Sequence, residues 1–172
     1  TQKPSPPFTT STLQQEAGRK LRFTAKRAMQ AAQRLYENGF ITYMRTDSTT
    51  LSKEAISGAR DLIADTYGKE NLPEEPRIYQ TKVKNAQEAH EAIRPAGSKF
   101  KHPKEVESSV GPDEKRIYEL IWQRTVASQM KDARGHRTVL GLGIDETEFQ
   151  ATGKTVEFPG FRLAYVETAE DS

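Results

Sequence analysis

The sequence has no cysteine among its 172 residues, which excludes a disulfide framework, a thiolate metal site and a cysteine nucleophile. No apolar run reaches the roughly 18 residues that a transmembrane helix needs. The first residues, T-Q-K-P-S-P-P-F, lack the basic-then-apolar order of a signal peptide. We therefore expect a soluble, cytoplasmic protein with no membrane partner.

Motifs for several common chemistries are also missing. The sequence contains neither a glycine-rich phosphate loop nor a Gly-x-Ser-x-Gly elbow, which argues against nucleotide hydrolysis and serine esterase chemistry. No two of the three histidines have metal-ligand spacing. The carboxylate cluster D-E-T-E at 145–148 has no evident partners. The sequence therefore predicts no metal site within this chain.

The net charge of +2 hides an uneven distribution. Residues 1–50 carry eight Lys or Arg against three Asp or Glu, whereas residues 51–130 carry thirteen of each kind. Residues 131–172 carry five basic and eight acidic residues. A basic first section suits a polyanion such as a nucleic-acid backbone. A solvated helix face rich in lysine and arginine would explain the same charge equally well.

Hydroxyl side chains that can cap a helix precede three stretches of helical character, at Ser11, Thr24 and Ser52. After Thr24, apolar residues repeat at helical spacing until Asn38-Gly39 supplies a stop. Pro112 suits a first helical position, and a helix before Arg94 must end there because proline follows. The pattern predicts helices at about residues 12–21, 25–37, 53–67, 86–93 and 112–130.

The character of the chain changes after Met130, where segments 138–144, 148–158 and 161–166 have the composition of strands. Thr152-Gly153-Lys154 fits a hairpin connection. We predict a mainly α fold with a β-rich C-terminal part: a helical domain at 1–130 and a partial β-rich domain at 131–172. Three strands alone bury little surface, so we expect the chain to be a fragment of a larger protein.

The candidate for chemistry is Tyr43, in the β-rich segment 40–45, which we predict to be a short strand or extended loop. A phenol with an ordinary pKa of about 10 is a poor nucleophile without help. In an extended chain Arg45 projects from the same face about 6.5 Å away, where it could stabilise a phenolate and hold a phosphate. A half-buried packing tyrosine is the alternative, because Tyr-x-Arg alone is a weak signal.

Three other residues could serve the same site. Asp47 could orient Arg45 or a histidine, or could simply begin the turn before the next helix. Thr42 offers a hydroxyl to a phosphate oxygen or to local backbone groups. His90, in Q-E-A-H-E-A-I-R-P, has an ordinary pKa near neutrality, which suits proton transfer or a phosphate contact as well as a structural role.

Three stretches, taken in order, resemble bacterial topoisomerase I of the type IA DNA topoisomerases: P-F-T-T-S-T-L-Q-Q-E-A, A-Q-R-L-Y-E-N-G-F-I-T-Y-M-R-T-D-S-T-T-L-S and A-Q-E-A-H-E-A-I-R-P. The resemblance is strong over about residues 7–130. It implies a helical catalytic-tyrosine domain with a helix-turn-helix-like arrangement, followed by antiparallel strands of the adjoining gate domain.

The resemblance implies that Tyr43 is the nucleophile, that Arg45 holds the scissile phosphate and that His90 is the active-site histidine. It implies less defined support roles for Gln33, Thr42 and Asp47. Tyr43 would attack single-stranded DNA, form a 5′-phosphotyrosine link and free a 3′-hydroxyl. Another strand would pass, and the ends would be resealed without ATP, which relaxes negative supercoils.

A non-catalytic alternative uses the basic helix alone. A helical module could grip DNA without chemistry through Lys26, Arg27 and Arg34. A segment that serves only contact between domains is a third possibility.

The sequence departs from the family in what it lacks. The family needs a Toprim domain whose acidic residues bind magnesium, and neither this domain nor the remaining gate strands occur in the sequence. We therefore expect no cofactor in this chain and Mg²⁺ in the full enzyme. The expected partners are single-stranded DNA in the bacterial nucleoid and the missing Toprim and gate domains, without which the chain should be inactive.

Overall fold

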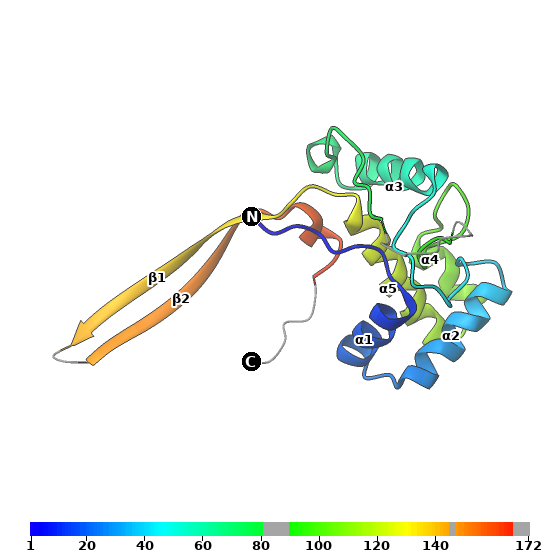
Figure 1. The fold of residues 1–172 in the computed structure, drawn as a ribbon, viewed down its shortest axis with the longest axis horizontal. Helices are drawn as coiled ribbons and strands as arrows, with labels where there is room; N and C mark the ends of the chain where they lie inside the picture. The colour runs from blue at the N-terminus through cyan, green and yellow to red at the C-terminus, as the bar shows by residue number, and fades with distance from the viewer. Residues whose placement is uncertain (81–89, 145–146, 167–172) are drawn as a thin grey trace.

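The computed structural model describes residues 1–80, 90–144 and 147–166, with side chains outside 136–157. A helical body carries a long ribbon of two strands that projects from it (Figure 1). The elements are α1 (Thr10–Leu21), α2 (Ala25–Glu37), α3 (Lys53–Thr66), η1 (Lys69–Asn71), α4 (Pro103–Val106), η2 (Glu107–Ser109), α5 (Pro112–Ser128), β1 (Arg134–Ile144), β2 (Thr147–Phe158) and η3 (Gly160–Leu163).

The first three helices begin at side chains that accept a backbone hydrogen bond. Thr24 caps α2 and Ser52 caps α3, as predicted. Helix α1 begins earlier than predicted, because Thr9 and Thr12 form a reciprocal capping box in place of a cap at Ser11. Helices α1 and α2 are separated only by residues 22–24 and pack against each other.

Helix α5 is the central element of the body, in contact with α1, α2, α3, α4 and η3. Its apolar residues, together with Met130 just after its end, are buried: Ile117, Leu120, Ile121, Trp122, Val126 and Met130. The mainly helical prediction is therefore confirmed for the body. None of the helices in the described part of the chain has the length and apolar surface that a membrane span requires.

The predicted helix at 86–93 is not found where the structure can test it. Residues 81–89 lie outside the described residues, and residues 90–93 are not helical. Ile93 instead forms a backbone bridge with Phe8. The helical propensity of these residues is a weak preference, and pairing with distant segments overrides it.

The expectation of a β-rich C-terminal part is not supported. Strands β1 and β2 pair antiparallel in one ribbon, and residues 152–154 lie within β2 rather than at a turn. Residues 161–166 are not a strand, because η3 follows Pro159 and buries Phe161 against the body. Gly160 makes this change of direction with φ of 52°, and a Cβ there would lie 2.5 Å from the carbonyl oxygens of residues 131 and 132. The domain boundary near residue 130 stays a prediction.

Candidate active site

Tyr43 lies on the irregular segment that joins α2 to α3. Its side chain is 49% exposed, and its ring meets the ring of Tyr36 edge to face, with centroids 5.2 Å apart. Met44 is buried, while Arg45 is exposed. This alternation matches an extended chain that presents Tyr43 and Arg45 to solvent and anchors itself through the residue between them.

Segment 92–96 holds the start of the Tyr43 segment. Ile41 forms a backbone bridge with Pro95, and the Thr42 N–H donates to the Arg94 carbonyl oxygen at 2.9 Å. The Thr42 hydroxyl donates to the Ala92 carbonyl oxygen at 2.8 Å and accepts from the Arg94 N–H at 3.0 Å. The predicted support residue Thr42 therefore has its hydroxyl in a backbone junction that fixes the position of its neighbour Tyr43.

The first residue of α1 holds the other side of the same segment. The Thr10 hydroxyl donates to the Met44 carbonyl oxygen at 2.7 Å and accepts from the Thr46 N–H at 2.9 Å. The Thr10 N–H donates to the Thr46 carbonyl oxygen at 2.9 Å. Three hydrogen bonds thus bracket Arg45. Sequence reasoning missed Thr10, although it lies in the motif that carried the family resemblance.

The pairing with segment 92–96 also brings the histidine motif to the tyrosine segment. The Ala92 N–H donates to the Thr50 carbonyl oxygen at 2.8 Å, so the chain just after His90 runs beside the Tyr43 segment. His90 and Asp47 are both exposed. The structure therefore brings together the two motifs that contain Tyr43 and His90, and the roles of these residues stay predictions.

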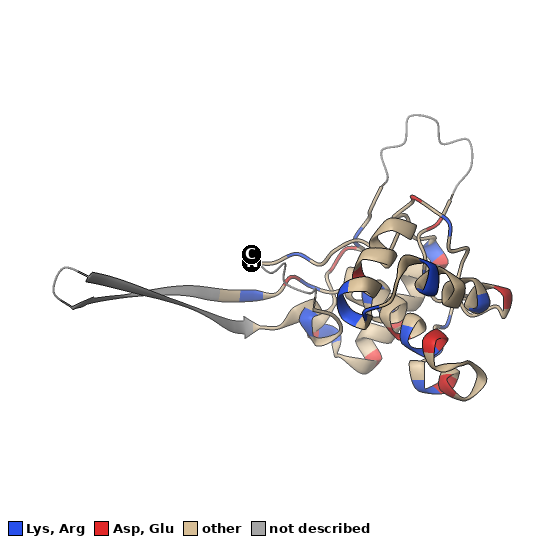
Figure 2. Cartoon of the chain, turned by 90° about the horizontal axis from the view of Figure 1, so that it is seen from below, with Lys and Arg blue, Asp and Glu red and all other residues tan. Residues whose placement is uncertain are grey.

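The predicted basic residues of α2 are exposed, and two of them form ion pairs with the first turn of α5. Arg27 donates to both carboxylate oxygens of Asp113, at 2.8 and 2.9 Å, and Arg34 donates to Glu114 at 2.9 Å. The hydrogen bond from Arg27 lowers the pKa of Asp113 below its ordinary value. Lysines and arginines lie on several elements of the body rather than on one (Figure 2).

The other predicted positions on α2 differ in their contacts. Gln33 donates to Glu37 on the same helix at 3.0 Å, and Lys26 is exposed in the first turn. The Arg27–Asp113 pair is exposed to solvent and therefore screened, whereas Glu114, the partner of Arg34, is buried. The basic face of α2 is thus partly neutralised in this structure.

The sequence model of the family described as DNA topoisomerase matches residues 1–172. The chain belongs to this family. Its resemblance to bacterial type IA topoisomerase I, which the three motifs carried, is thereby confirmed.

The relatives of this topoisomerase chain are much longer proteins. It is 60% identical to DNA topoisomerase 1 of Mycobacterium leprae over 99% of the chain and 18% of that protein. It is 61% identical to DNA topoisomerase 1 of Mycobacterium tuberculosis (strain H37Rv) over 98% of the chain and 19% of that protein. The solved full-length topoisomerase I of Thermotoga maritima superposes with a TM-score of 0.79 at 38% identity, over 98% of the chain and 29% of that structure. The chain thus spans about a fifth of the curated relatives' length.

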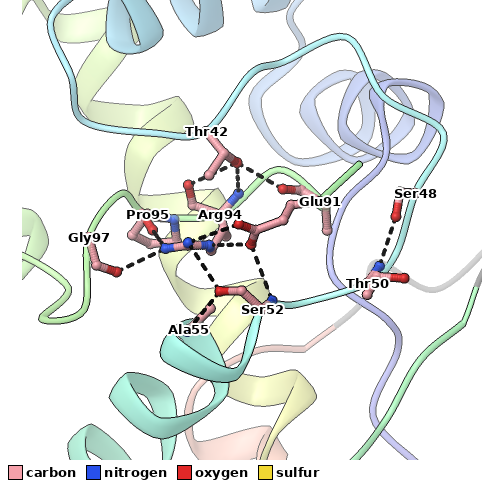
Figure 3. A network of polar contacts seen from close by, with 10 residues as sticks. Thr42, Ser48, Thr50, Ser52, Ala55, Glu91, Arg94, Pro95 and Gly97 are labelled. Carbon is pink, nitrogen blue, oxygen red and sulfur yellow. Dashed lines mark hydrogen bonds and ion pairs between the residues drawn. The ribbon is translucent and has the colours of Figure 1, made fainter. Parts of the chain in front are cut away.

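An ion pair between buried Arg94 and partly exposed Glu91 was missed by sequence reasoning. Arg94 is 4% exposed and donates to both carboxylate oxygens of Glu91, and its guanidinium also reaches the hydroxyl of Ser52 (Figure 3). The sequence predicted a helix at 86–93 that ends before Arg94 and assigned this arginine no role.

Burial by itself would raise the pKa of Glu91. The hydrogen bonds and the charge of Arg94, together with hydrogen bonds from Ser52, outweigh burial, so the pKa of this carboxyl lies below its ordinary value. Glu91 is therefore ionised at neutral pH and the pair is a true ion pair.

The described residues do not provide a magnesium site. Among the residues whose side chains are described, 1–80, 90–135 and 158–166, no three or more His, Asp or Glu side chains come together in a way that could hold a metal ion. The acidic stretch 145–148 lies outside these residues. These residues do not fit the magnesium ion that the family resemblance implies.

Proposed function

We propose that the chain carries the nucleophile of a type IA DNA topoisomerase, and that this nucleophile is Tyr43. The supporting observation is a half-exposed tyrosine on an irregular segment that two other parts of the chain hold in place. Reactive side chains are commonly found on such loops when a rigid scaffold positions them. Membership of the DNA topoisomerase family makes the backbone of single-stranded DNA the substrate that we propose.

The proposed reaction exchanges one phosphodiester for another. The phenolic oxygen of Tyr43 forms a bond to phosphorus while the bond from phosphorus to the 3′ oxygen breaks. The phenol loses its proton, and the departing 3′ oxygen gains one. The products are a 5′-phosphotyrosine and a 3′-hydroxyl, which reverse the step after another strand has passed. Because the ester energy is conserved, relaxation of negative supercoils needs no ATP.

Arg45 and His90 are the proposed partners of Tyr43. A guanidinium can hold two phosphate oxygens at once, and exposed Arg45 lies two residues from the nucleophile. The imidazole of His90 can carry a proton near neutral pH or contact the phosphate. Gln33 and Asp47 are proposed to support the site, and Lys26, Arg27 and Arg34 to contact the DNA backbone.

We propose that the rest of the activity depends on other parts of a longer enzyme. A Toprim domain would supply the magnesium site, and further gate strands would complete the passage for DNA. The reaction would take place on chromosomal DNA in the cytoplasm. On this proposal the 172-residue chain alone does not relax supercoiled DNA, and magnesium-dependent relaxation by the purified chain would contradict it.

The test removes one hydroxyl from Tyr43 in a full-length DNA topoisomerase that carries this chain. Tyr43→Phe should abolish the covalent product with a labelled single-stranded oligonucleotide, visible on a denaturing gel, because the attacking oxygen is gone. Non-covalent binding should change by less than about threefold, because the ring remains.

Tyr36→Phe is the matched control, since Tyr36 is 43% exposed and contacts Tyr43 through its ring. This variant should still form the covalent product. Trapping by Tyr43→Phe would show that Tyr43 is not the nucleophile. An unaltered enzyme that binds the oligonucleotide but never becomes linked to it would favour the alternative of a non-catalytic DNA-binding module.

A further inference from the structure

The guanidinium of Arg94 is buried, and each of its N–H donors has a hydrogen-bond acceptor. The side chain is 5% exposed. Its Nε and Nη2 donate to the Glu91 carboxylate at 2.7 and 3.1 Å, Nη1 donates to the carbonyl oxygens of Pro95 and Gly97 at 2.9 Å each, and Nη2 also reaches the Ser52 hydroxyl at 3.4 Å. A guanidinium has five N–H donors in a planar fork, whereas a lysine ammonium has three donors and cannot satisfy this set.

The main chain of Arg94 holds the residue before the proposed nucleophile. Its carbonyl oxygen accepts from the Thr42 N–H at 2.9 Å, and its N–H donates to the Thr42 hydroxyl at 3.0 Å. Thr42 has little freedom to move without breaking both bonds. A shift of the Arg94 main chain would therefore move Thr42 and, with it, the backbone of Tyr43.

The side-chain partners of Arg94 hold two further points of the site (Figure 3). Ser52 caps α3 at the end of the segment that carries Tyr43. Its N–H donates to the Glu91 carboxylate at 3.3 Å. Glu91 directly follows His90 in the chain. Arg94 therefore holds Thr42 through its main chain, and its guanidinium holds Ser52 at the end of the tyrosine segment and Glu91 beside the histidine.

We propose that Arg94, held by Glu91, is a positioning residue that sets Tyr43 and His90 relative to each other without touching DNA. This inference rests on the proposed function of Tyr43. All five donors of Arg94 are occupied and its side chain is buried, so a phosphate has no access to it. A displacement of about 1 Å at a reacting group can cost about a hundredfold in rate.

The test is Arg94→Lys in a full-length DNA topoisomerase that carries this chain. Lysine keeps the positive charge but cannot bridge the carboxylate, both carbonyl oxygens and the hydroxyl. The single-turnover rate of oligonucleotide cleavage at saturating DNA should fall about 10- to 100-fold. The dissociation constant for the oligonucleotide should change by less than about threefold, because no DNA contact is lost.

Two further variants separate positioning from stability. Ile63→Val removes one methyl group from a fully buried residue of α3 and should lower stability slightly while leaving the cleavage rate within about twofold. Glu91→Gln keeps the size of the side chain but removes its charge, and should lower the rate with binding unchanged. If Arg94→Lys does not fold, the Glu91→Gln rate decides the question.

Three results would overturn the proposal: a folded Arg94→Lys enzyme that cleaves at the parent rate, a loss confined to DNA binding, or an equal loss of rate in Ile63→Val. Tyr43→Phe is assayed in parallel. A covalent DNA product formed by Tyr43→Phe would contradict both the proposed function and this inference. An inactive Tyr43→Phe beside an unimpaired Arg94→Lys would remove only the positioning role.

Discussion

Two neighbouring tyrosines show what distinguishes a candidate nucleophile at the scale of the residue. Tyr36 and Tyr43 are 43% and 49% exposed and touch through their rings. Tyr36 lies on α2 and has a regular helical backbone. Tyr43 lies on a segment whose backbone is held by Thr10 and by residues 92–96. The difference therefore lies in the backbone that carries the phenol, because the exposure of the two side chains is almost the same.

The lowered pKa of Glu91 gives a prediction about stability and pH. A carboxyl whose pKa is lower in the folded than in the unfolded state stabilises the fold above its unfolded pKa of about 4.3. This contribution is lost as the pH falls through the lowered pKa. The parent chain should therefore be more stable than Glu91→Gln at about pH 6, and the difference should shrink toward about pH 3.

Urea denaturation of both chains across this range measures the difference directly. Other carboxylates titrate in the same range, but they are common to both chains and cancel in the comparison. A difference that stays constant with pH would mean that Glu91 contributes through its shape and hydrogen bonds alone.

The alternating exposure around Tyr43 could be predicted from the sequence, because it depends only on the extended backbone. The burial of Arg94 could not, because residues 91–97 enclose its guanidinium only in a non-helical arrangement that also bonds to Thr42 and Ser52, far away in the sequence. The same limit applies to Thr10. Its hydroxyl serves residues 44 and 46, which lie far along the chain.

At the scale of the element, the helices that carry their own start signals were predicted well. Helices α2, α3 and α5 begin where Thr24, Ser52 and Pro112 place them. Segments 90–93 and 161–166 were predicted wrongly, because their conformation depends on partners that are distant in sequence. Local propensity decides an element only where tertiary pairing does not compete with it.

The ion pairs between α2 and α5 give a prediction about DNA binding. Asp113→Asn in the full-length enzyme removes the carboxylate that occupies Arg27. The freed guanidinium should strengthen oligonucleotide binding by about two- to fivefold at low salt, and the gain should shrink as salt screens the phosphates. Stability should change little, since the pair is exposed to solvent.

Glu54→Gln is the control for this measurement, because it removes one negative charge from the first turn of α3. An equal gain in both variants would assign the effect to net charge rather than to Arg27. No gain in either variant would indicate that this face of α2 does not meet DNA in the enzyme.

At the scale of the whole molecule, the site depends on contacts between segments that are far apart in sequence. Within the described residues, isolated backbone bridges join such segments: Gln2 with Ala133, Phe8 with Ile93, and Ile41 with Pro95. The N-terminal segment consequently runs from the base of the β1–β2 ribbon into the body beside the tyrosine segment (Figure 1). The irregular segments of the chain, more than its helices, assemble the candidate site.

A buried polar cluster of Tyr165, Glu16 and Arg124 connects the C-terminal segment to the body, and it should contribute to stability. The Tyr165 hydroxyl donates to the Glu16 carboxylate of α1 and accepts from Arg124 of α5 at 3.3 Å. Burial raises the pKa of Tyr165, and its hydrogen bond to Glu16 raises it further, so the hydroxyl stays protonated as a donor. Tyr165→Phe removes this donor while Glu16 remains 4% exposed.

Loss of one hydrogen bond to a buried charge should lower the free energy of unfolding of Tyr165→Phe by about 1–3 kcal/mol. Tyr36→Phe, which removes a hydroxyl from an exposed ring, should change it by less than about 0.5 kcal/mol. Urea denaturation of the two variants and the parent chain measures both values. Equal free energies of unfolding in all three would mean that the cluster is solvated in solution and does not fix the C-terminal segment. Removing a hydrogen-bond donor destabilises the fold only where the carboxylate that accepts from it is buried.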